Sequence, residues 1–197
     1  MFVGSYKFYK TVQSEFFNGK FSTQQYDGIQ AILNKWQISG FTDLRWLAYM
    51  LGTVYHETAR TMYPIEEYGK GKGRKYGKKF KQSGLPYLEP DHVYYGRGYV
   101  QLTWYENYER MGRILKIPLL THPELALQPS IAADIMFEGM TKSVSFVGDF
   151  TGRCLEQYFD STKEDWINAR RIINGLDRAD LIADYSKRFF TILKETT

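Results

Sequence analysis

Apolar residues recur at helical spacing through most of this 197-residue chain. Ser22 and Gln25 form a capping-box pattern, which predicts a helix that begins there and ends before Gly40. The apolar stripe of this predicted helix consists of Tyr26, Ile29, Ile32, Leu33 and Trp36. Because such a stripe has to be buried against other elements, the pattern favours a core built from packed helices.

A second helix is predicted to begin at a cap formed by Thr42 or Asp43 and to end near Glu57, because Pro64 prevents a long continuation. Its buried stripe consists of Leu44, Leu47, Ala48, Leu51, Val54 and Tyr55. The longest apolar stretch, residues 46–55, is far shorter than the ~20 residues that cross a bilayer. The sequence therefore predicts no stable membrane insertion.

Further helices are predicted over 104–115 and over 178–194. Another is predicted to begin at Ser130 and to carry Ile131, Ile135 and Val144. A capping box of Ser161 and Glu164 predicts a helix over 161–173. Asn174 and Gly175 indicate a turn that closes the helix before them. A small region near residues 60–103 favours extended structure. Residues 1–197 contain no repeats or linkers, so a single domain of mainly α class with a small extended or β region is expected.

The lone cysteine, Cys154, cannot form an internal disulfide, which suits synthesis in a reducing cytosol. Residues 1–10 contain two lysines within an aromatic run and lack the apolar core of a cleaved signal peptide. We therefore expect synthesis in the cytoplasm without a signal peptide. No metal is expected, because His56 and Glu57 begin like a zinc-binding H-E-x-x-H motif but Arg60 takes the place of its second histidine.

Positive charge is concentrated in residues 69–81 (GKGKGRKYGKKFK), called the basic segment below, which contains seven basic residues and no acidic residue. Four glycines interleave with these charges, which predicts a mobile loop rather than a helix. An anionic partner is expected for it, and nucleic acid, a membrane surface and an anionic polymer such as bacterial cell wall are the candidates. The alternative is a solvated loop that only aids solubility.

Glu57 and Glu66 are candidates for acid–base chemistry. Glu57 closes an apolar helix, where a carboxyl group is partly desolvated, as a general acid requires. Pro64 forces the chain out of the helix between them, so the two carboxyl groups can face each other across a cleft. The intervening residues easily span the ~6.5–9.5 Å that separates the carboxyl groups of an inverting glycosidase. The alternative is a solvated helix end at Glu57, with Glu66 and Glu67 balancing the neighbouring lysines.

The segment YYGRGYVQLTWYENY, residues 94–108, is rich in aromatic and hydrogen-bonding side chains. If residues 97–103 are extended, the polar face carries Arg97, Tyr99, Gln101 and Thr103, and the packed face carries Gly98, Val100 and Leu102. The polar face suits a sugar, whose hydroxyls need hydrogen-bond partners and whose ring faces stack on aromatics. An edge strand facing water is the alternative, and Thr103 with Glu106 also matches a capping box.

The chain resembles the family 19 chitinase-like glycoside hydrolases of the lysozyme superfamily. Three segments carry the resemblance in the family's order: VYHETARTMYPIEE at 54–67, YYGRGYVQLTW at 94–104 and RRIINGLD at 170–177. The missing disulfides and the compact first segment are most similar to the endolysin, or muramidase, branch found in bacteriophages and prophages. This resemblance implies a lysozyme-like fold in which the small β region lines a substrate cleft.

The resemblance implies that Glu57 is the general acid and that Glu66 is the base that activates water. It also implies that Thr103 helps to position this water. The residues that it implies for sugar binding are Gln101, Asn174, Tyr95 and Arg171. Glu67 and Glu89 remain runners-up for the base, because the basic segment stands where plant-type members carry a longer loop with cysteines.

The activity implied is hydrolysis of the β-1,4 bond between N-acetylmuramic acid and N-acetylglucosamine, by inverting acid–base catalysis without a metal or cofactor. The partner would be peptidoglycan rather than nucleic acid. A monomer that acts in the periplasm or cell wall is expected. Three alternatives remain: a chitinase acting on an N-acetylglucosamine polymer, a lytic transglycosylase, and a non-enzymatic glycan-binding structural module of a bacteriophage.

Overall fold

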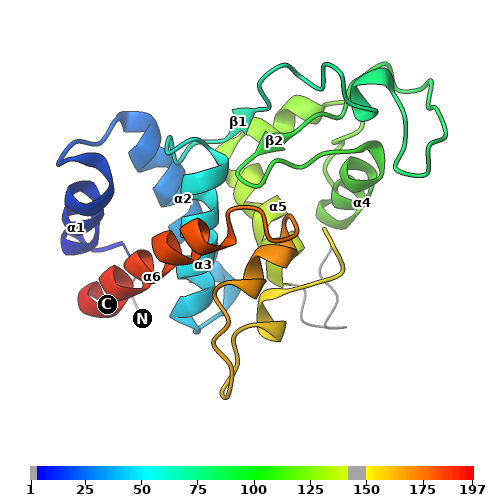
Figure 1. Ribbon diagram of the computed structural model, residues 1–197. Helices are drawn as coiled ribbons and strands as arrows, with labels where there is room; N and C mark the ends of the chain where they lie inside the picture. Colours follow the sequence, from blue (N-terminus) through cyan, green and yellow to red (C-terminus); the bar gives the residue numbers. More distant parts are fainter. Residues whose placement is uncertain (1–3, 142–149) are drawn as a thin grey trace.

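The structure, a computed structural model, describes residues 4–141 and 150–197 (Figure 1). Most of these residues lie in the α-helices α1 (Tyr6–Phe17), α2 (Thr23–Ser39), α3 (Leu44–Glu57), α4 (Tyr105–Leu115), α5 (Pro129–Thr141) and α6 (Ala179–Thr196). Strands β1 (Ile65–Glu66) and β2 (Arg97–Gly98) pair antiparallel. Among the described helices, none is long and apolar enough to cross a membrane. The predicted mainly α class with a small β region is confirmed.

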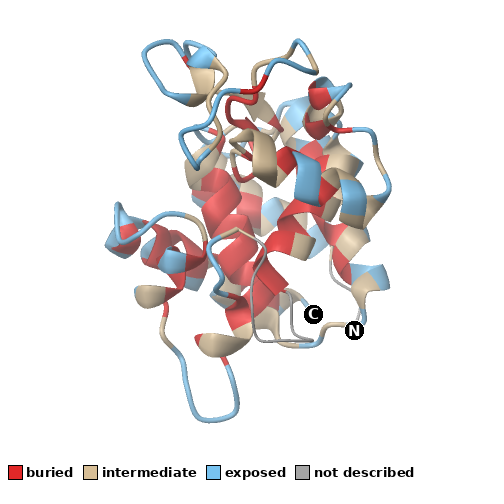
Figure 2. Cartoon of the chain, turned by 90° about the vertical axis from the view of Figure 1, so that its right-hand side faces the viewer, coloured by how far each residue is buried: buried red, intermediate tan, exposed pale blue. Residues whose placement is uncertain are grey.

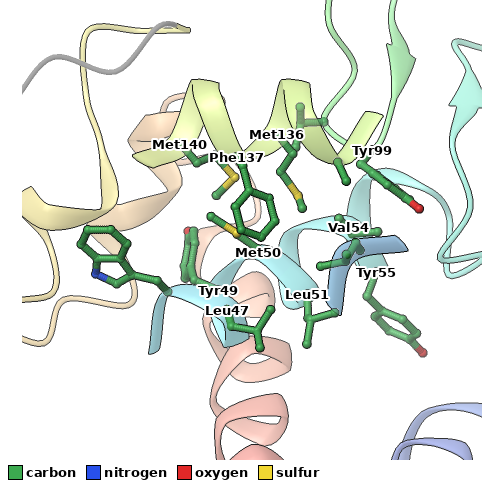
Figure 3. Close-up of a cluster of buried hydrophobic side chains, with 14 of the residues drawn as sticks. Leu47, Tyr49, Met50, Leu51, Val54, Tyr55, Tyr99, Met136, Phe137 and Met140 are labelled. Atoms are coloured by element: carbon green, nitrogen blue, oxygen red, sulfur yellow. The ribbon is translucent and has the colours of Figure 1, made fainter. Parts of the chain in front are cut away.

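Helix α3 runs through the centre of the molecule, and every residue from Trp46 to Tyr55 is buried (Figures 1 and 2). Side chains of α5, including Met136, Phe137 and Met140, meet those of α3 in the core (Figure 3). Helix α6 packs against α3 as well. Because neighbouring elements cover α3 on all sides, its last residue, Glu57, is held in a fixed frame.

The contact between α3 and α6 depends on Gly52. A Cβ atom at this position would lie 2.2 Å from Ser186 Oγ and 2.8 Å from Ser186 N. Only a residue without a side chain therefore allows the two helices to approach this closely. The close approach fixes the C-terminal half of α3 relative to α6.

The predicted capping signals are confirmed where local hydrogen bonds decide the structure. Ser22 and Gln25 form a complete capping box at the start of α2, and Gly40 ends that helix with φ of 76°. Asp43 caps α3 by accepting a hydrogen bond from Arg45 N at 2.9 Å. These caps place Glu57 at the helix end that the sequence predicts.

One helix was missed and one helix prediction is wrong. Helix α1 was not predicted, although the Ser5 side chain caps it by accepting a hydrogen bond from Phe8 N. The helix predicted over 161–173 is wrong, because the Asp160 carboxylate accepts bonds from the backbone of the next residues and only Asn168–Ile172 form a 3-10 helix. Val144, assigned to the helix that begins at Ser130, lies outside the described residues.

The extended strand predicted over 97–103 is also wrong, because only its first two residues form β2. The chain then turns back, so that Arg97 and Leu102 exchange two backbone hydrogen bonds. Tyr99 points into the core, where its hydroxyl donates to Gly28 O at 2.8 Å. The alternation of faces is therefore lost after Gly98.

The basic segment forms successive hydrogen-bonded turns with a short 3-10 helix at Tyr76–Lys78, so it is a loop rather than an α-helix. Its backbone crosses itself closely, because a Cβ atom on Gly77 would lie 1.8 Å from Gly71 O. Lys70 forms an ion pair with Glu66, and Lys79 forms one with Asp91. Part of the positive charge is thus neutralised within the fold.

Candidate active site

A cavity of about 450 Å³ lies at the C-terminal end of α3. Four of the predicted site residues line it: Glu57, Gln101, Thr103 and Asn174. They come from the end of α3, from the turn after β2 and from the loop before α6. Segments that are far apart in the sequence therefore converge on one space.

Glu57 is held by a buried arginine. Arg170 Nη1 donates to Glu57 Oε1 at 2.6 Å, and the exposed fractions of the two side chains are 3% for Arg170 and 16% for Glu57. Arg170 Nε also donates to Asp177 O at 2.9 Å, so the guanidinium is fixed at two points. A charge-assisted bond of this kind fixes the orientation of the carboxyl group at the cavity wall.

Arg171, which the resemblance implied, does not line the cavity; its Nε donates to Asn168 Oδ1 and its side chain is exposed. The neighbouring Arg170 makes the contact with Glu57 instead, which sequence reasoning missed. Two adjacent arginines in a short 3-10 helix point in different directions, and the sequence carries no signal that says which one turns inward.

Glu66, on β1, is surrounded by donors. Its Oε1 accepts from Tyr95 OH at 2.5 Å, and its Oε2 lies 2.8 Å from Lys70 Nζ. The hydrogen bond from Lys70 and then that from Tyr95 hold the pKa of the Glu66 carboxyl below its usual range. The guanidinium of Arg97 stacks 3.6 Å from the centre of the Tyr95 ring and adds positive charge. Such a carboxylate stays ionised, as a general base requires.

Glu66 and Tyr95 are not among the residues that line the cavity. They connect to it through Gln101, whose Nε2 donates to Ile65 O at 3.2 Å, next to Glu66 in the chain. The cavity is therefore lined by the predicted acid, whereas the predicted base lies on the adjoining strand, outside the cavity lining.

The runners-up for the base are placed differently. Glu67 uses both of its oxygens within the fold: Oε1 accepts from Tyr76 OH at 2.8 Å, and Oε2 accepts from Gly96 N at 3.0 Å. Glu89 is exposed and does not line the cavity. Glu66 also has both oxygens bonded, but its partners include the charged Lys70, whereas Glu67 accepts only from a tyrosine hydroxyl and a backbone amide.

The turn after β2 is strained where it lines the cavity. Gln101 has φ of 55°, and Trp104 has φ of 78° with ψ of 142°, a region that residues other than glycine seldom occupy. Thr103 Oγ1 donates to Gln101 O at 2.7 Å instead of capping α4, so the capping box predicted with Glu106 is wrong. Gln101, Thr103 and Trp104 of this turn all line the cavity.

The residues that line the cavity but that sequence reasoning did not assign to the site include Tyr76, Trp104 and Asn107. Tyr76 and Trp104 pack edge to face with ring centres 5.1 Å apart. Burial, followed by the bond to Glu67, raises the pKa of Tyr76 to about 12. Asn107 Nδ2 donates to Thr103 O at 2.8 Å. Aromatic rings beside amides and a hydroxyl are the chemistry that binds a sugar.

Within residues 4–141 and 150–197, no group of three or more His, Cys, Asp or Glu side chains is arranged to hold a metal ion. Cys154 is buried, and burial raises the pKa of its thiol. A buried thiol with a raised pKa is a poor nucleophile.

Comparison with protein-family models finds no match for this chain. Two endochitinases of Arabidopsis thaliana are 37% and 34% identical to it over 90 residues, which is 45% of this chain. The match covers 29% of the length of each of these curated relatives.

Solved structures match over nearly the whole chain. Chitinase C from Streptomyces griseus has a TM-score of 0.63 at 23% identity, covering 97% of this chain and 78% of that one. A bacterial family 19 chitinase has a TM-score of 0.63 at 23% identity, covering 98% and 95%. The chain has the fold of the family 19 chitinases. A class IV family 19 chitinase from Zea mays agrees, with a TM-score of 0.61 at 22% identity over 94% of this chain and 92% of that one. The fold implied by the three sequence segments is thus confirmed.

Proposed function

We propose that this chain is a glycoside hydrolase that cleaves β-1,4 bonds in an N-acetylhexosamine polymer by inverting acid–base catalysis. The observation that carries the proposal is the Glu57 carboxyl group, which lines the cavity and is oriented by the buried Arg170. The similarity of this chain to endochitinases over 90 residues also supports glycoside hydrolysis.

In the proposed reaction, the Glu57 carboxyl group donates its proton to the glycosidic oxygen as the bond to the sugar carbon breaks. Glu66 accepts a proton from the water whose oxygen attacks that carbon from the opposite face. Thr103 Oγ1 donates to a backbone carbonyl, so its lone pairs remain to accept a hydrogen bond from this water. Gln101, Asn174 and the ring of Trp104 contact the sugars.

Peptidoglycan is the first candidate substrate, because of the charge near the cavity. Tyr76, within the basic segment, lines the cavity, and Lys72, Lys75 and Lys78 of that segment are exposed. A positive surface at the mouth of a cleft raises the encounter rate with an anionic polymer. Chitin is the second candidate, and the named relatives favour it because they are endochitinases and chitinases.

The experiment digests purified peptidoglycan and chitin oligosaccharides with wild type, Glu57→Gln and Glu66→Gln, followed by mass spectrometry of the product ends. The proposal predicts hydrolysed reducing ends, with rates at least ~100-fold lower in both variants. A lytic transglycosylase would retain activity in Glu66→Gln and give 1,6-anhydro ends. If the wild-type chain releases no product, it is a binding module without activity, and the proposal is refuted.

The charge argument has its own test. Replacing Lys72, Lys75 and Lys78 by glutamine should slow cell-wall digestion more at low than at high ionic strength, because salt screens exposed charges. The matched control replaces three exposed lysines elsewhere, namely Lys20, Lys116 and Lys187. An equal loss at both ionic strengths, or an equal loss in the control, would remove the electrostatic argument for peptidoglycan.

We further propose the role of a bacteriophage or prophage endolysin, made in the host cytoplasm and acting as a monomer on the cell wall. This role follows from peptidoglycan as substrate and from the resemblance to the endolysin branch. The chain would be expressed in bacterial cells, alone or together with a membrane-permeabilising protein. Lysis of the cells only when both proteins are expressed would support this role. Lysis without such a partner would contradict it.

A further inference from the structure

A second cavity, of about 340 Å³, lies where the end of α3 meets the start of α6. It shares no lining residue with the cavity around Glu57. Its polar lining is basic and contains no acidic residue: Arg60 and Arg178 with His56. The remaining wall is mostly aromatic or aliphatic, with Tyr55, Tyr185 and Leu181. Nothing in the proposed reaction uses these groups.

The two guanidinium groups are available to a ligand. Within the described parts of the chain, neither Arg60 nor Arg178 forms an ion pair with a carboxylate. The Arg60 guanidinium lies 5.8 Å from the centre of the Tyr55 ring, which supports it from one side. Of the acidic groups whose charges act on His56, Glu57 is bound to Arg170, and Asp177 directly precedes Arg178. The cavity lining itself therefore has two arginines and no carboxylate, with Asp177 and Asp180 next to it in the chain but outside the lining.

The backbone around this cavity is strained at three residues that are not glycine. Ala59, Arg60 and Arg178 have φ of 50°, 69° and 57°. Left-handed conformations cost free energy for such residues and occur preferentially at ligand clamps and functional sites. Arg178 is also the N-cap residue of α6 and gives that helix no side-chain cap, so the positive end of the helix dipole lies beside the cavity, with Asp180 in the first turn. Strain, charge and an uncapped helix end thus coincide.

We propose that this cavity binds a small organic carboxylate, specifically the free C-terminal carboxylate of a short peptide. The two guanidinium groups would hold the carboxylate through paired hydrogen bonds. Tyr55, Tyr185 and Leu181 would cover the small aliphatic side chains next to it. A volume of about 340 Å³ lies in the range of small-molecule sites and exceeds the needs of a bare oxyanion. The carboxylate could come from two sources. One is the peptide stem of peptidoglycan, which ends in such a carboxylate, and this source rests on the proposed function. The other is a free small acid.

The first experiment titrates three probes into the full chain by calorimetry: N-acetyl-D-alanyl-D-alanine, its C-terminal amide and inorganic phosphate. The dipeptide should bind at least about tenfold more tightly than the amide or phosphate, because it alone offers both a carboxylate and an aliphatic body. Equal binding of phosphate would reduce the cavity to a general anion site and overturn the proposal. So would the absence of dipeptide binding.

The variants are Arg60→Gly and Arg178→Gly, which remove the guanidinium groups and relieve the left-handed strain. Both should stay folded in a thermal-shift assay and should weaken dipeptide binding by about 10- to 100-fold. The matched control is Arg153→Gly, which removes an exposed arginine outside the cavity and should leave binding unchanged. Unchanged binding in both cavity variants would overturn the proposal.

The source of the carboxylate is decided by hydrolysis of glycan strands with and without peptide stems. If stems are the ligand, Arg178→Gly raises KM about tenfold for strands with stems and leaves peptide-free strands unchanged. If the variant loses dipeptide binding but KM is unchanged for both strands, the stem is excluded and a free acid is the ligand. Failure of the wild type to cleave any glycan would refute the proposed function, while the dipeptide titration would still decide the cavity.

Discussion

Replacing Arg170 by methionine removes the one buried group that holds the predicted general acid. The side chain of Arg170 is 3% exposed and that of Glu57 is 16% exposed, so the variant leaves a largely buried carboxylate without its partner. Removal of one member of such a pair costs about 3–5 kcal/mol, and we expect about 3 kcal/mol because the carboxylate retains some contact with water. For a chain of this length, that corresponds to a fall in Tm of roughly 6–12 °C.

Urea denaturation of the wild type, Arg170→Met, Glu57→Gln and the double variant closes a thermodynamic cycle. The losses in the free energy of unfolding of the two single variants should add up to more than the loss in the double variant. The difference, which is the coupling free energy, should be about 1–3 kcal/mol. Arg171→Met is the matched control, because the Arg171 side chain is exposed and bonds to Asn168 rather than to Glu57; its cost should stay within ~0.5 kcal/mol. Additive losses, or equal costs in Arg170→Met and the control, would refute the reasoning. In kinetics, Arg170→Met should lower kcat but cause no further loss when Glu57 is already glutamine.

Three other predictions concern the base and the backbone. Lys70→Met should raise the pKa of Glu66, so the acidic limb of the pH profile of kcat/KM moves to higher pH; an unmoved limb would argue against Glu66 as the base. Gly52→Ala should destabilise the chain by about 3 kcal/mol in urea, because its Cβ would collide with Ser186, and a neutral effect would contradict the packing of α3 on α6. Gln101→Gly should lower activity because it removes the amide that lines the cavity, with a change in stability within about 1 kcal/mol, since relief of the strain at φ of 55° offsets the lost bonds to Ile65 and Gly98; unchanged activity would contradict the role of Gln101.

Helix boundaries were predictable from the sequence where a single side chain satisfies the first backbone groups. Ser22 and Asp43 do this for α2 and α3, and both ends of α3 follow from nearby residues. The same logic fails near Ser161, because Asp160 captures the backbone of a turn before a helix can begin. Local capping residues compete with one another, and a sequence pattern does not show which one wins.

The candidate site was predictable where the residues themselves carry the chemistry. Glu57, Gln101, Thr103 and Asn174 line one cavity, as the three sequence segments imply. Two features of the site could not be predicted from the sequence. The turn after β2 overrides strand alternation, since Tyr99 gains a buried hydrogen bond by turning inward. The choice between adjacent arginines depends on tertiary contacts that no local spacing encodes.

The central claim is acid–base hydrolysis with inversion at Glu57 and Glu66. The most direct measurement is proton NMR of the anomeric configuration of the first product formed from a chitin or peptidoglycan oligosaccharide. The account predicts that the α-anomer appears first and that mutarotation then produces the β-anomer. Initial formation of the β-anomer, or of a 1,6-anhydro sugar, would contradict the claim.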